Sequence, residues 1–381
     1  MRGAEAAVSI EPLAMSVLIP THRRPRAVAR CLAALARQTP EAGSHEIVLG
    51  FDGPDPAGEA AAARAWDEAG GQPGRLRIVA GPRRGYIDVR HRLLPTLRGE
   101  VVVHLNDDVV PVPGFLAAHR EAHAALAAAG RRAVIVGDSR FAPPEDPTLL
   151  DAALDRTGLV FFWHAMAGDG SDAGPDADRD WGYRHCFGLN MSVLREELDA
   201  VGGMPSVPDT YGYDDVELGW RLARRGLPVL HRPAAAAPHE HRYRAAALLA
   251  REFRLGQAAV RYARINPDFA GELFGRPILA AEERAWARAF LERERGDLLR
   301  RRERFLGLDT VPARAVGEAM LPLACELVAD HARPLRRGCW CEGLLTECGE
   351  PLDSADAVTP GELGTDRSAS AASAASLAVA S

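Results

Sequence analysis

The 381-residue chain is 47% hydrophobic and 26% charged, a composition typical of a folded globular protein of one large domain or two ordinary ones. Its net charge of −6 and pI of about 6.1 argue against nucleic acid as a partner. The sequence has neither a signal-peptide pattern nor an apolar run of the roughly 18 residues that span a bilayer. We therefore expect a cytoplasmic protein without a transmembrane segment, with peripheral contact to the inner face of a membrane left open.

Apolar runs and helix-forming stretches alternate from the start of the chain. The predicted strands are 16–20, 47–51, 76–79 and 101–105. The predicted helices between them are about 25–38, 57–69 and 85–98. A strict alternation of this kind predicts an α/β fold with a parallel, doubly wound sheet and right-handed crossovers.

The turn after the first predicted strand, PTHRRP at 20–25, narrows the choice of ligand. It has no glycine fingerprint that lets a pyrophosphate approach a helix N-terminus, which argues against a nicotinamide dinucleotide. The sequence also lacks a P-loop and the G-x-S-x-G motif of a nucleophile elbow.

An acidic pair, Asp107 and Asp108, follows the fourth predicted strand directly. Carboxylates at the carboxyl end of a buried strand lie at the rim of an α/β sheet, where open sheets bind ligands. Two acids that face a nucleotide diphosphate need a cation between them, and Mg²⁺ or Mn²⁺ suits oxygen ligands. The alternative is that the pair only starts a turn or caps the next helix.

The next part of the chain is less regular. We predict a helix to about residue 130 and strands at 133–136, 186–193 and 228–230. The acidic, glycine-rich stretch 168–178 is either a lid over the substrate or a surface insertion, and the insertion is slightly favoured.

A second acidic pair, Asp214 and Asp215, opens an amphipathic helix that ends near Gly226. A role as helix N-cap explains one aspartate, but not a pair that follows an aromatic, glycine-containing segment. His239 and His241 follow on an extended segment that is predicted to place them on opposite faces, so at most one is expected to be a ligand. Taken alone, a solvent-facing histidine is the favoured interpretation.

The last third of the chain is predicted to be helical at 244–264 and 280–305, and the many glutamates of the second helix favour a solvated face over a membrane surface. Four cysteines near the end lack the paired spacing of common zinc sites, which disfavours zinc. They are Cys325, Cys339, Cys341 and Cys348. The tail at 354–381 is rich in Ala, Ser and Gly and is predicted to be disordered.

Taken in order, these motifs make residues 14–265 resemble the family 2 glycosyltransferases of GT-A fold. The matching segments are SVLIPTHRRP, Asp52 after the second strand, RRGYIDVRHRLLPTLRGEVVVHLNDDVVP, GLNMSVLREELDAVGGMP and YGYDDVELGWRLARRG. The resemblance implies a doubly wound, mainly parallel sheet, here with a C-terminal helical extension. It also implies a hexosyltransferase that moves a sugar from a nucleotide-diphosphate sugar to an acceptor hydroxyl with inversion, using Mn²⁺ or Mg²⁺.

The resemblance further implies roles for individual residues. The donor-binding positions it indicates are Pro20, Thr21, Asp52, Arg90, Asn106 and Asp107. Asn106-Asp107-Asp108 matches the D-x-D motif with asparagine in first place, which makes Asp108 the metal-ligand candidate. His239 matches a late histidine that contacts the metal in related enzymes.

In the second acidic pair, Asp215 matches the general base, with Asp214 in place of glutamate before it. An aspartate at a helix N-terminus is expected to be ionised at neutral pH and so able to take a hydroxyl proton. Secondary candidates are Asp214, Trp220 and His241.

The implied division of the chain is a flexible leader at 1–14, a nucleotide-sugar-binding half at 15–140, an acceptor-binding half at 141–265, a helical extension at 266–353 and the tail. Two alternative functions remain, a sugar nucleotidyltransferase and a catalytically degenerate domain that binds nucleotide or glycan. A small-molecule, glycan or lipid-linked acceptor is possible, and the donor sugar, the oligomeric state and the role of the extension are open.

Overall fold

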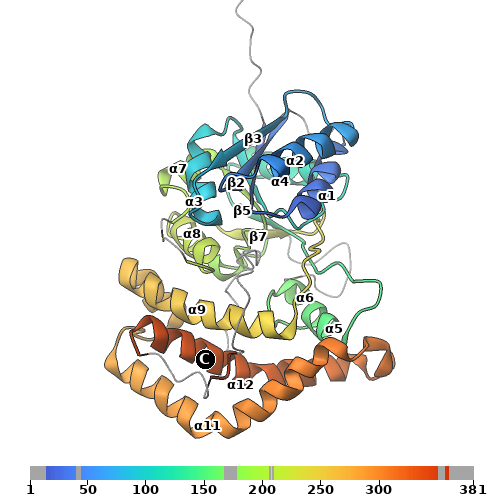
Figure 1. Ribbon diagram of the computed structural model, residues 1–381. Helices are drawn as coiled ribbons and strands as arrows, with labels where there is room; N and C mark the ends of the chain where they lie inside the picture. The colour runs from blue at the N-terminus through green and yellow to red at the C-terminus, as the bar shows by residue number, and fades with distance from the viewer. Residues whose placement is uncertain are drawn as a thin grey trace, which may run out of the picture.

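The computed structural model describes residues 14–39, 44–166, 178–205, 207, 210–350 and 357–359. The predicted leader, acidic loop and tail lie almost wholly outside these ranges. Within them, a sheet with flanking helices forms one end of the molecule and a layer of long helices forms the other (Figure 1).

Seven strands form one sheet in the order β3-β2-β1-β4-β6-β5-β7. Their bounds are β1 Met15–Thr21, β2 His45–Asp52, β3 Leu76–Gly81, β4 Val101–Leu105, β5 Val134–Gly137, β6 Asn190–Leu194 and β7 Val229–Arg232. β1 to β4 are parallel, β5 is parallel to β7, and β6 is antiparallel to both of its neighbours. The predicted doubly wound, mainly parallel sheet is confirmed.

Every residue of β1, β2 and β4 is buried, as expected for central strands of a sheet covered on both faces. This burial explains why these segments are almost continuously apolar. Two predicted boundaries differ. The predicted strand 186–193 begins only at Asn190, because its amide closes a turn on Phe187 O. The predicted helix 85–98 gives way after Leu93 to a short 3-10 turn that contains Pro95, which lacks an N–H for a longer helix.

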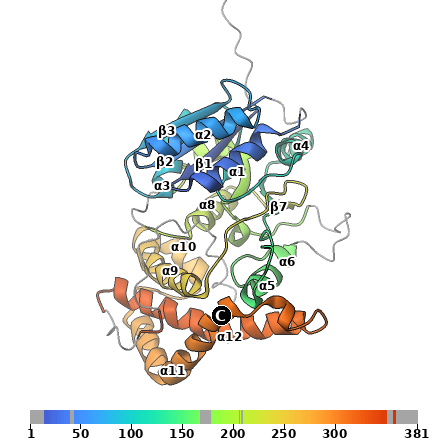
Figure 2. The same ribbon diagram turned by 45° about the vertical axis from the view of Figure 1, so that its right-hand side comes forward.

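The helices either flank the sheet or form the layer of long helices at the other end of the molecule. They are α1 Pro25–Ala36, α2 Pro56–Glu68, α3 Tyr86–Leu93, α4 Phe115–Ala128, α5 Leu149–Arg156, α6 Trp163–Met166, α7 Arg195–Ala200, α8 Asp214–Ala223, α9 Ala245–Ile265, α10 Pro267–Phe274, α11 Ala281–Gly307 and α12 Leu321–Glu347. Figure 2 shows α1 and α2 side by side against the blue strands, while α11 and α12 lie beyond α9. Among the helices described, none is long and apolar enough to cross a membrane.

The predicted C-terminal helical extension is confirmed, and it packs tightly on the rest of the chain. Gly256 of α9 and Gly343 of α12 lie where the two helices meet, and a Cβ at either would collide with backbone of the other helix. The segment before α12 also attaches to the start of α5, since Ala313 N donates to Pro147 O at 2.8 Å. The extension is therefore anchored at two places.

The C-terminal cysteines do not form a metal site. All four are free thiols on α12 or directly after it, and Cys325, Cys339 and Cys341 are buried. Over the described ranges, no group of three or more His, Cys, Asp or Glu side chains is arranged to hold a metal ion.

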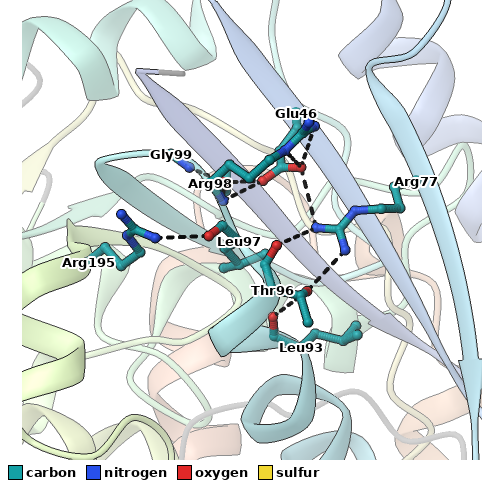
Figure 3. A network of polar contacts seen from close by, with 9 residues as sticks. Glu46, Arg77, Leu93, Thr96, Leu97, Arg98, Gly99 and Arg195 are labelled. Atoms are coloured by element: carbon teal, nitrogen blue, oxygen red, sulfur yellow. Dashed lines mark hydrogen bonds and ion pairs between the residues drawn. The ribbon is translucent and has the colours of Figure 1, made fainter. Parts of the chain in front are cut away.

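Glu46, near the amino end of β2, is the centre of a buried polar network (Figure 3). Its carboxylate accepts hydrogen bonds from Ser16 Oγ and from Arg98 N, both at 2.7 Å, and pairs with Arg77 at 3.4 Å. Burial raises the pKa of Glu46, but the bonds from Ser16 and Arg98 outweigh it and lower the pKa below its ordinary value. Because these contacts fasten the turn before β4 at the amino ends of the strands, we assign them to folding.

Candidate active site

The carboxyl ends of three parallel strands bring most of the predicted donor-binding residues to one edge of the sheet. Thr21 ends β1, Asp52 ends β2, and Asn106 directly follows β4. Pro20 lies beside Gly50 in the β1–β2 register. All of these residues are buried or nearly so.

Arg24, the residue before α1, binds both aspartates of the first acidic pair. Its Nη1 lies 2.8 Å from Asp107 Oδ1, and its Nη2 lies 2.9 Å from Asp108 Oδ2. Thr21 Oγ1 donates to the other Asp107 oxygen at 2.7 Å. The next helix, α4, has Gly114 as its N-cap and no side-chain cap, so capping does not explain the pair. The two carboxylates instead form a buried anionic centre.

Both histidines of the late extended segment approach the same oxygen of this centre. Asp108 Oδ2 is 3.3 Å from His239 Nε2 and 3.6 Å from His241 Nδ1. The two rings stack at 5.6 Å. The prediction of opposite faces is wrong, because side chains alternate along an extended chain and residues two apart share a face. The solvent-facing interpretation is also wrong for His239, which is fully buried.

The charges of these neighbours set the ionisation of the first acidic pair. Burial alone would raise the pKa of Asp108, but His239, Arg24 and His241 outweigh it and hold the pKa well below its ordinary value. Burial raises the pKa of Asp107 to about 6, with Arg24 opposing the rise and the charge of Asp108 adding to it. Asp108 is therefore an ionised carboxylate at neutral pH.

Asp108 and His239 fit a divalent cation. Neither ring nitrogen of His239 has a hydrogen-bond partner within the described part of the chain, although the ring is buried. The 3.3 Å between Asp108 Oδ2 and His239 Nε2 suits two ligands that each lie about 2.1 Å from one shared ion. With only two protein ligands, most coordination positions would be left for substrate phosphates and water, as is usual for Mg²⁺.

Asp52 organises the loop that leads into α3. Its Oδ1 accepts hydrogen bonds from Arg84 N at 2.7 Å and from Gly85 N at 3.0 Å. The ring of His22 lies 2.7 Å from the backbone oxygen of Asp52. Asp52 thus connects the ends of β1 and β2 to the start of α3.

Arg90 connects the first acidic pair to the second. Its guanidinium is fully buried and donates from Nη2 to Asn106 Oδ1 and to Gly188 O, both at 2.8 Å. The amide of Gly188 in turn donates to Asp215 Oδ2 at 2.9 Å. A Cβ at Gly188 would lie 3.0 Å from Arg90 Nη1 and 3.1 Å from Asp215 Cβ, so this position has room only for glycine without some displacement.

Asp214 and Asp215 are the first two residues of α8, after Tyr213 in the left-handed conformation at φ +63°. Both oxygens of Asp215 accept backbone N–H groups, from Gly188 and from Val216 at 2.9 Å. Asp214 Oδ1 accepts the hydroxyl of Tyr86 at 2.5 Å, whereas its buried Oδ2 has no hydrogen-bond partner among the described residues. The two acids therefore have different surroundings.

Burial raises the pKa of Asp215 to about 7, and the charge of Asp214 adds to the rise. Burial raises the pKa of Asp214 as well. The expectation that Asp215 is fully ionised at neutral pH is therefore wrong for the protein without substrate. Loss of hydration and the adjacent carboxylate outweigh the helix N-terminus and the backbone hydrogen bonds.

Residues 16–190 match the model of glycosyl transferase family 2. These residues carry a glycosyltransferase family 2 domain. Two similar proteins are validoxylamine A glucosyltransferases of Streptomyces hygroscopicus, from subsp. jinggangensis (strain 5008) and subsp. limoneus. Each is 27% identical over 288 residues, which cover 70% of this chain but 64% and 60% of the relatives. The chain thus matches less than two thirds of their length.

The fold of the chain is that of the GT-A enzymes. It is similar to a mannosyltransferase from Pyrobaculum calidifontis solved in complex with GDP-Man and Mn²⁺, with a TM-score of 0.50 and 17% identity. The likeness covers 88% of this chain and 86% of the mannosyltransferase.

Trp220 is the one secondary candidate whose contacts lie away from the rest of the site. Its indole N–H donates to Glu272 of α10 at 2.7 Å, and its ring packs on Phe269, so it fastens α8 to α10. Conversely, sequence reasoning missed three residues at the centre of the candidate site, Arg24, Tyr86 and Gly188. Each lies inside a segment that carries the family resemblance, but its role depends on contacts 27 to 128 residues away along the chain.

Proposed function

We propose that this glycosyltransferase moves a hexosyl group from a nucleotide-diphosphate sugar to an acceptor hydroxyl, with inversion and with a bound divalent cation. The observation that carries the proposal is the link between two acid pairs with different environments. Asp108 lies 3.3 Å from the buried imidazole of His239, Asp215 is held at a helix N-terminus, and Arg90 lies between the two pairs.

The donor would lie along the carboxyl ends of β1, β2 and β4. We assign Pro20, Thr21 and Asp52 to the nucleoside. The loop at 84–85 that Asp52 organises would then close the nucleoside side of the site. Arg90 and Asn106 are buried and mutually bonded, so we assign them to positioning the acid pairs and the end of β4 on the donor side.

We assign the cation to Asp108 and His239, with His241 adjacent. Mg²⁺ or Mn²⁺ bound there would stabilise the negative charge that develops on the departing diphosphate. The finding that the mannosyltransferase with the same fold was solved with Mn²⁺ and GDP-Man is consistent with this assignment.

We assign the general base to Asp215. The acceptor oxygen would form its bond to the anomeric carbon while the bond from that carbon to the diphosphate breaks. The hydroxyl proton would pass to the Asp215 carboxylate, and the leaving diphosphate would keep the bonding electron pair. A single displacement of this kind inverts the anomeric carbon. A base with a pKa near 7 is well matched to proton transfer at neutral pH.

A cavity of about 430 Å³ supports an acceptor site in the half of the chain after residue 140. Phe141, Ala152, Tyr243 and His241 line it, and Leu321 of the helical extension forms part of its wall. His241 also lies 3.6 Å from Asp108, so the cavity begins one side chain from the proposed cation. Charged side chains such as Asp151, Asp155 and Arg242 line the cavity together with the apolar ones, so its size and lining suit a small polar molecule. We therefore propose 15–140 as the donor half, 141–265 as the acceptor half and 266–353 as a wall of the acceptor site.

The two similar proteins named validoxylamine A glucosyltransferases make a glucosyl donor with validoxylamine A as acceptor the first pair to test. The full chain would be incubated with Mn²⁺ and a panel of UDP-, GDP- and dTDP-hexoses, with and without validoxylamine A. Release of nucleoside diphosphate, with a new glycoside in the product, is the expected result. Pyrophosphate from a nucleoside triphosphate plus a sugar phosphate would indicate a nucleotidyltransferase instead. Binding without turnover of any donor would indicate a degenerate binding domain.

A further inference from the structure

One carboxylate oxygen, Asp108 Oδ2, is approached by an arginine and by the proposed cation ligand at the same time. Arg24 Nη2 lies 2.9 Å from this oxygen and His239 Nε2 lies 3.3 Å from it. A cation that Asp108 and His239 share would therefore bind the oxygen that Arg24 holds.

A guanidinium and a divalent cation would repel each other strongly on this oxygen. The Asp108 side chain is only 2% exposed, so water screens little of the repulsion. The Arg24 side chain is 19% exposed, whereas Asp108 and His239 are buried. Of the groups around this oxygen, we therefore expect the guanidinium to be the one that moves when a cation binds.

The contact of Arg24 with Asp107 does not use the contested oxygen. Arg24 Nη1 lies 2.8 Å from Asp107 Oδ1, and Thr21 holds the second Asp107 oxygen at 2.7 Å. Asp107 can thus keep its contact with Nη1 of Arg24 while the other edge of the guanidinium, with Nη2, leaves Asp108. A guanidinium edge presents paired N–H donors that match phosphate oxygens.

We propose that Arg24 is a built-in counter-ion that a divalent cation displaces from Asp108 and that then binds the donor diphosphate. Before the cation binds, the charge of Arg24 offsets part of the negative charge of the buried acid pair. After loading, Arg24 stays on Asp107 and offers its freed edge to the diphosphate. Arg24 would thereby couple cation binding to donor binding. The proposal rests on the proposed function for the cation site and for the identity of the anion.

The two roles of Arg24 predict opposite effects of one substitution. In Arg24→Gln, Mn²⁺ has no guanidinium to displace, and we expect it to bind about tenfold more tightly or better. With Mn²⁺ saturating, GDP or UDP loses a charged hydrogen-bonding partner, and we expect it to bind about tenfold more weakly. Electron paramagnetic resonance of free Mn²⁺ measures the first affinity and titration calorimetry the second, both on the full chain without a sugar donor.

Arg26→Gln is the matched control, because Arg26 is exposed on α1 and its loss changes the net charge equally. Both affinities should stay at the wild-type value in this variant. Arg24→Lys keeps the positive charge but cannot contact both aspartates as the two guanidinium nitrogens do. The Mn²⁺ affinity of this variant should therefore lie closer to wild type than that of Arg24→Gln. Thermal melts check that each variant folds, and Arg24→Met replaces Arg24→Gln if the latter does not.

Mn²⁺ affinity that is equal or weaker in Arg24→Gln overturns the proposal, as does an unchanged affinity for both nucleoside diphosphates. Mn²⁺ binding that is detected in Arg24→Gln but not in the wild type would be the strongest support for the proposal. These affinities are independent of turnover. If the wild type transfers sugar but the affinities do not move, the function stands and the counter-ion role fails. If the two affinities change in opposite directions while no donor is turned over, the counter-ion role stands and the proposed function fails.

Discussion

The hydroxyl of Tyr86, at the start of α3, donates a 2.5 Å hydrogen bond to Asp214, at the start of α8. Asp214 is buried and Tyr86 is partly buried, and the two residues are 128 positions apart in the chain. This bond makes the helix after β3 a direct support of the second acid pair.

Tyr86→Phe should therefore destabilise the protein, and more so at high pH. The phenol hydrogen bond lowers the pKa of Asp214 against the larger effect of burial, which raises it, so the bond matters most once Asp214 is ionised. We expect a loss of about 1–3 kcal/mol in the free energy of unfolding at about pH 8, and less at about pH 5. Urea unfolding at both pH values measures it. A loss that is equal at both would show that the bond does not depend on the charge of Asp214.

The pH profile of transfer should report Asp215. A base acts when deprotonated, so kcat/KM should rise with pH through about 7, the pKa to which burial and Asp214 raise this carboxyl. Asp214→Asn removes the neighbouring charge, and the rising limb should move to lower pH. Asp215→Asn should lower kcat by about 10²–10⁴-fold at every pH while donor binding survives. A rising limb that stays in place in Asp214→Asn would assign it to another group.

The proposed cation ligands can be ranked by titration with Mn²⁺. Asp108→Asn should abolish binding, because it removes the charged ligand that two histidines approach. His239→Ala should weaken binding on the order of 10–100-fold. His241→Ala should have a smaller effect, since His241 is partly exposed and 0.3 Å farther from Asp108 (3.6 against 3.3 Å). Equal effects of the two histidine variants would mean that both are ligands.

Gly188→Ala tests whether close packing positions the base. The added Cβ would press on Arg90 and Asp215, and each would have to move by a few tenths of an ångström. Because small misplacements of reacting groups are costly, we expect kcat to fall about tenfold or more with little change in the melting temperature. Gly271→Ala is the control, since a Cβ there meets nothing within 4 Å. An unaltered kcat in Gly188→Ala would show that the base tolerates this displacement.

The strands of the sheet could be predicted well from the sequence, because a strand that is buried on both faces has to be apolar along its length. β4 has the predicted bounds Val101–Leu105, and the acids that follow it are where open α/β sheets bind ligands. The side-chain pairings were harder. That Arg24 reaches Asp107 and Asp108, 83 and 84 residues later, depends on how α1 leaves β1, which no local pattern encodes. The ionisation of Asp215 was mispredicted for a related reason, since burial by distant segments outweighed the local helix terminus.

The cavity beside His241 gives a last test, of the acceptor half and of the extension together. Ala152 lines the cavity on α5 and is only partly buried, so Ala152→Trp should fill much of the space without disturbing the core. We expect transfer to the acceptor to fall by about tenfold or more through a higher KM for acceptor, because the pocket is lost while the donor edge of the sheet is untouched. Slow hydrolysis of the donor without acceptor should persist. Ala125→Trp, on the exposed face of α4, controls for surface bulk. If Ala152→Trp leaves the KM for acceptor unchanged, the acceptor binds elsewhere, and the wall formed by Leu321 has another purpose.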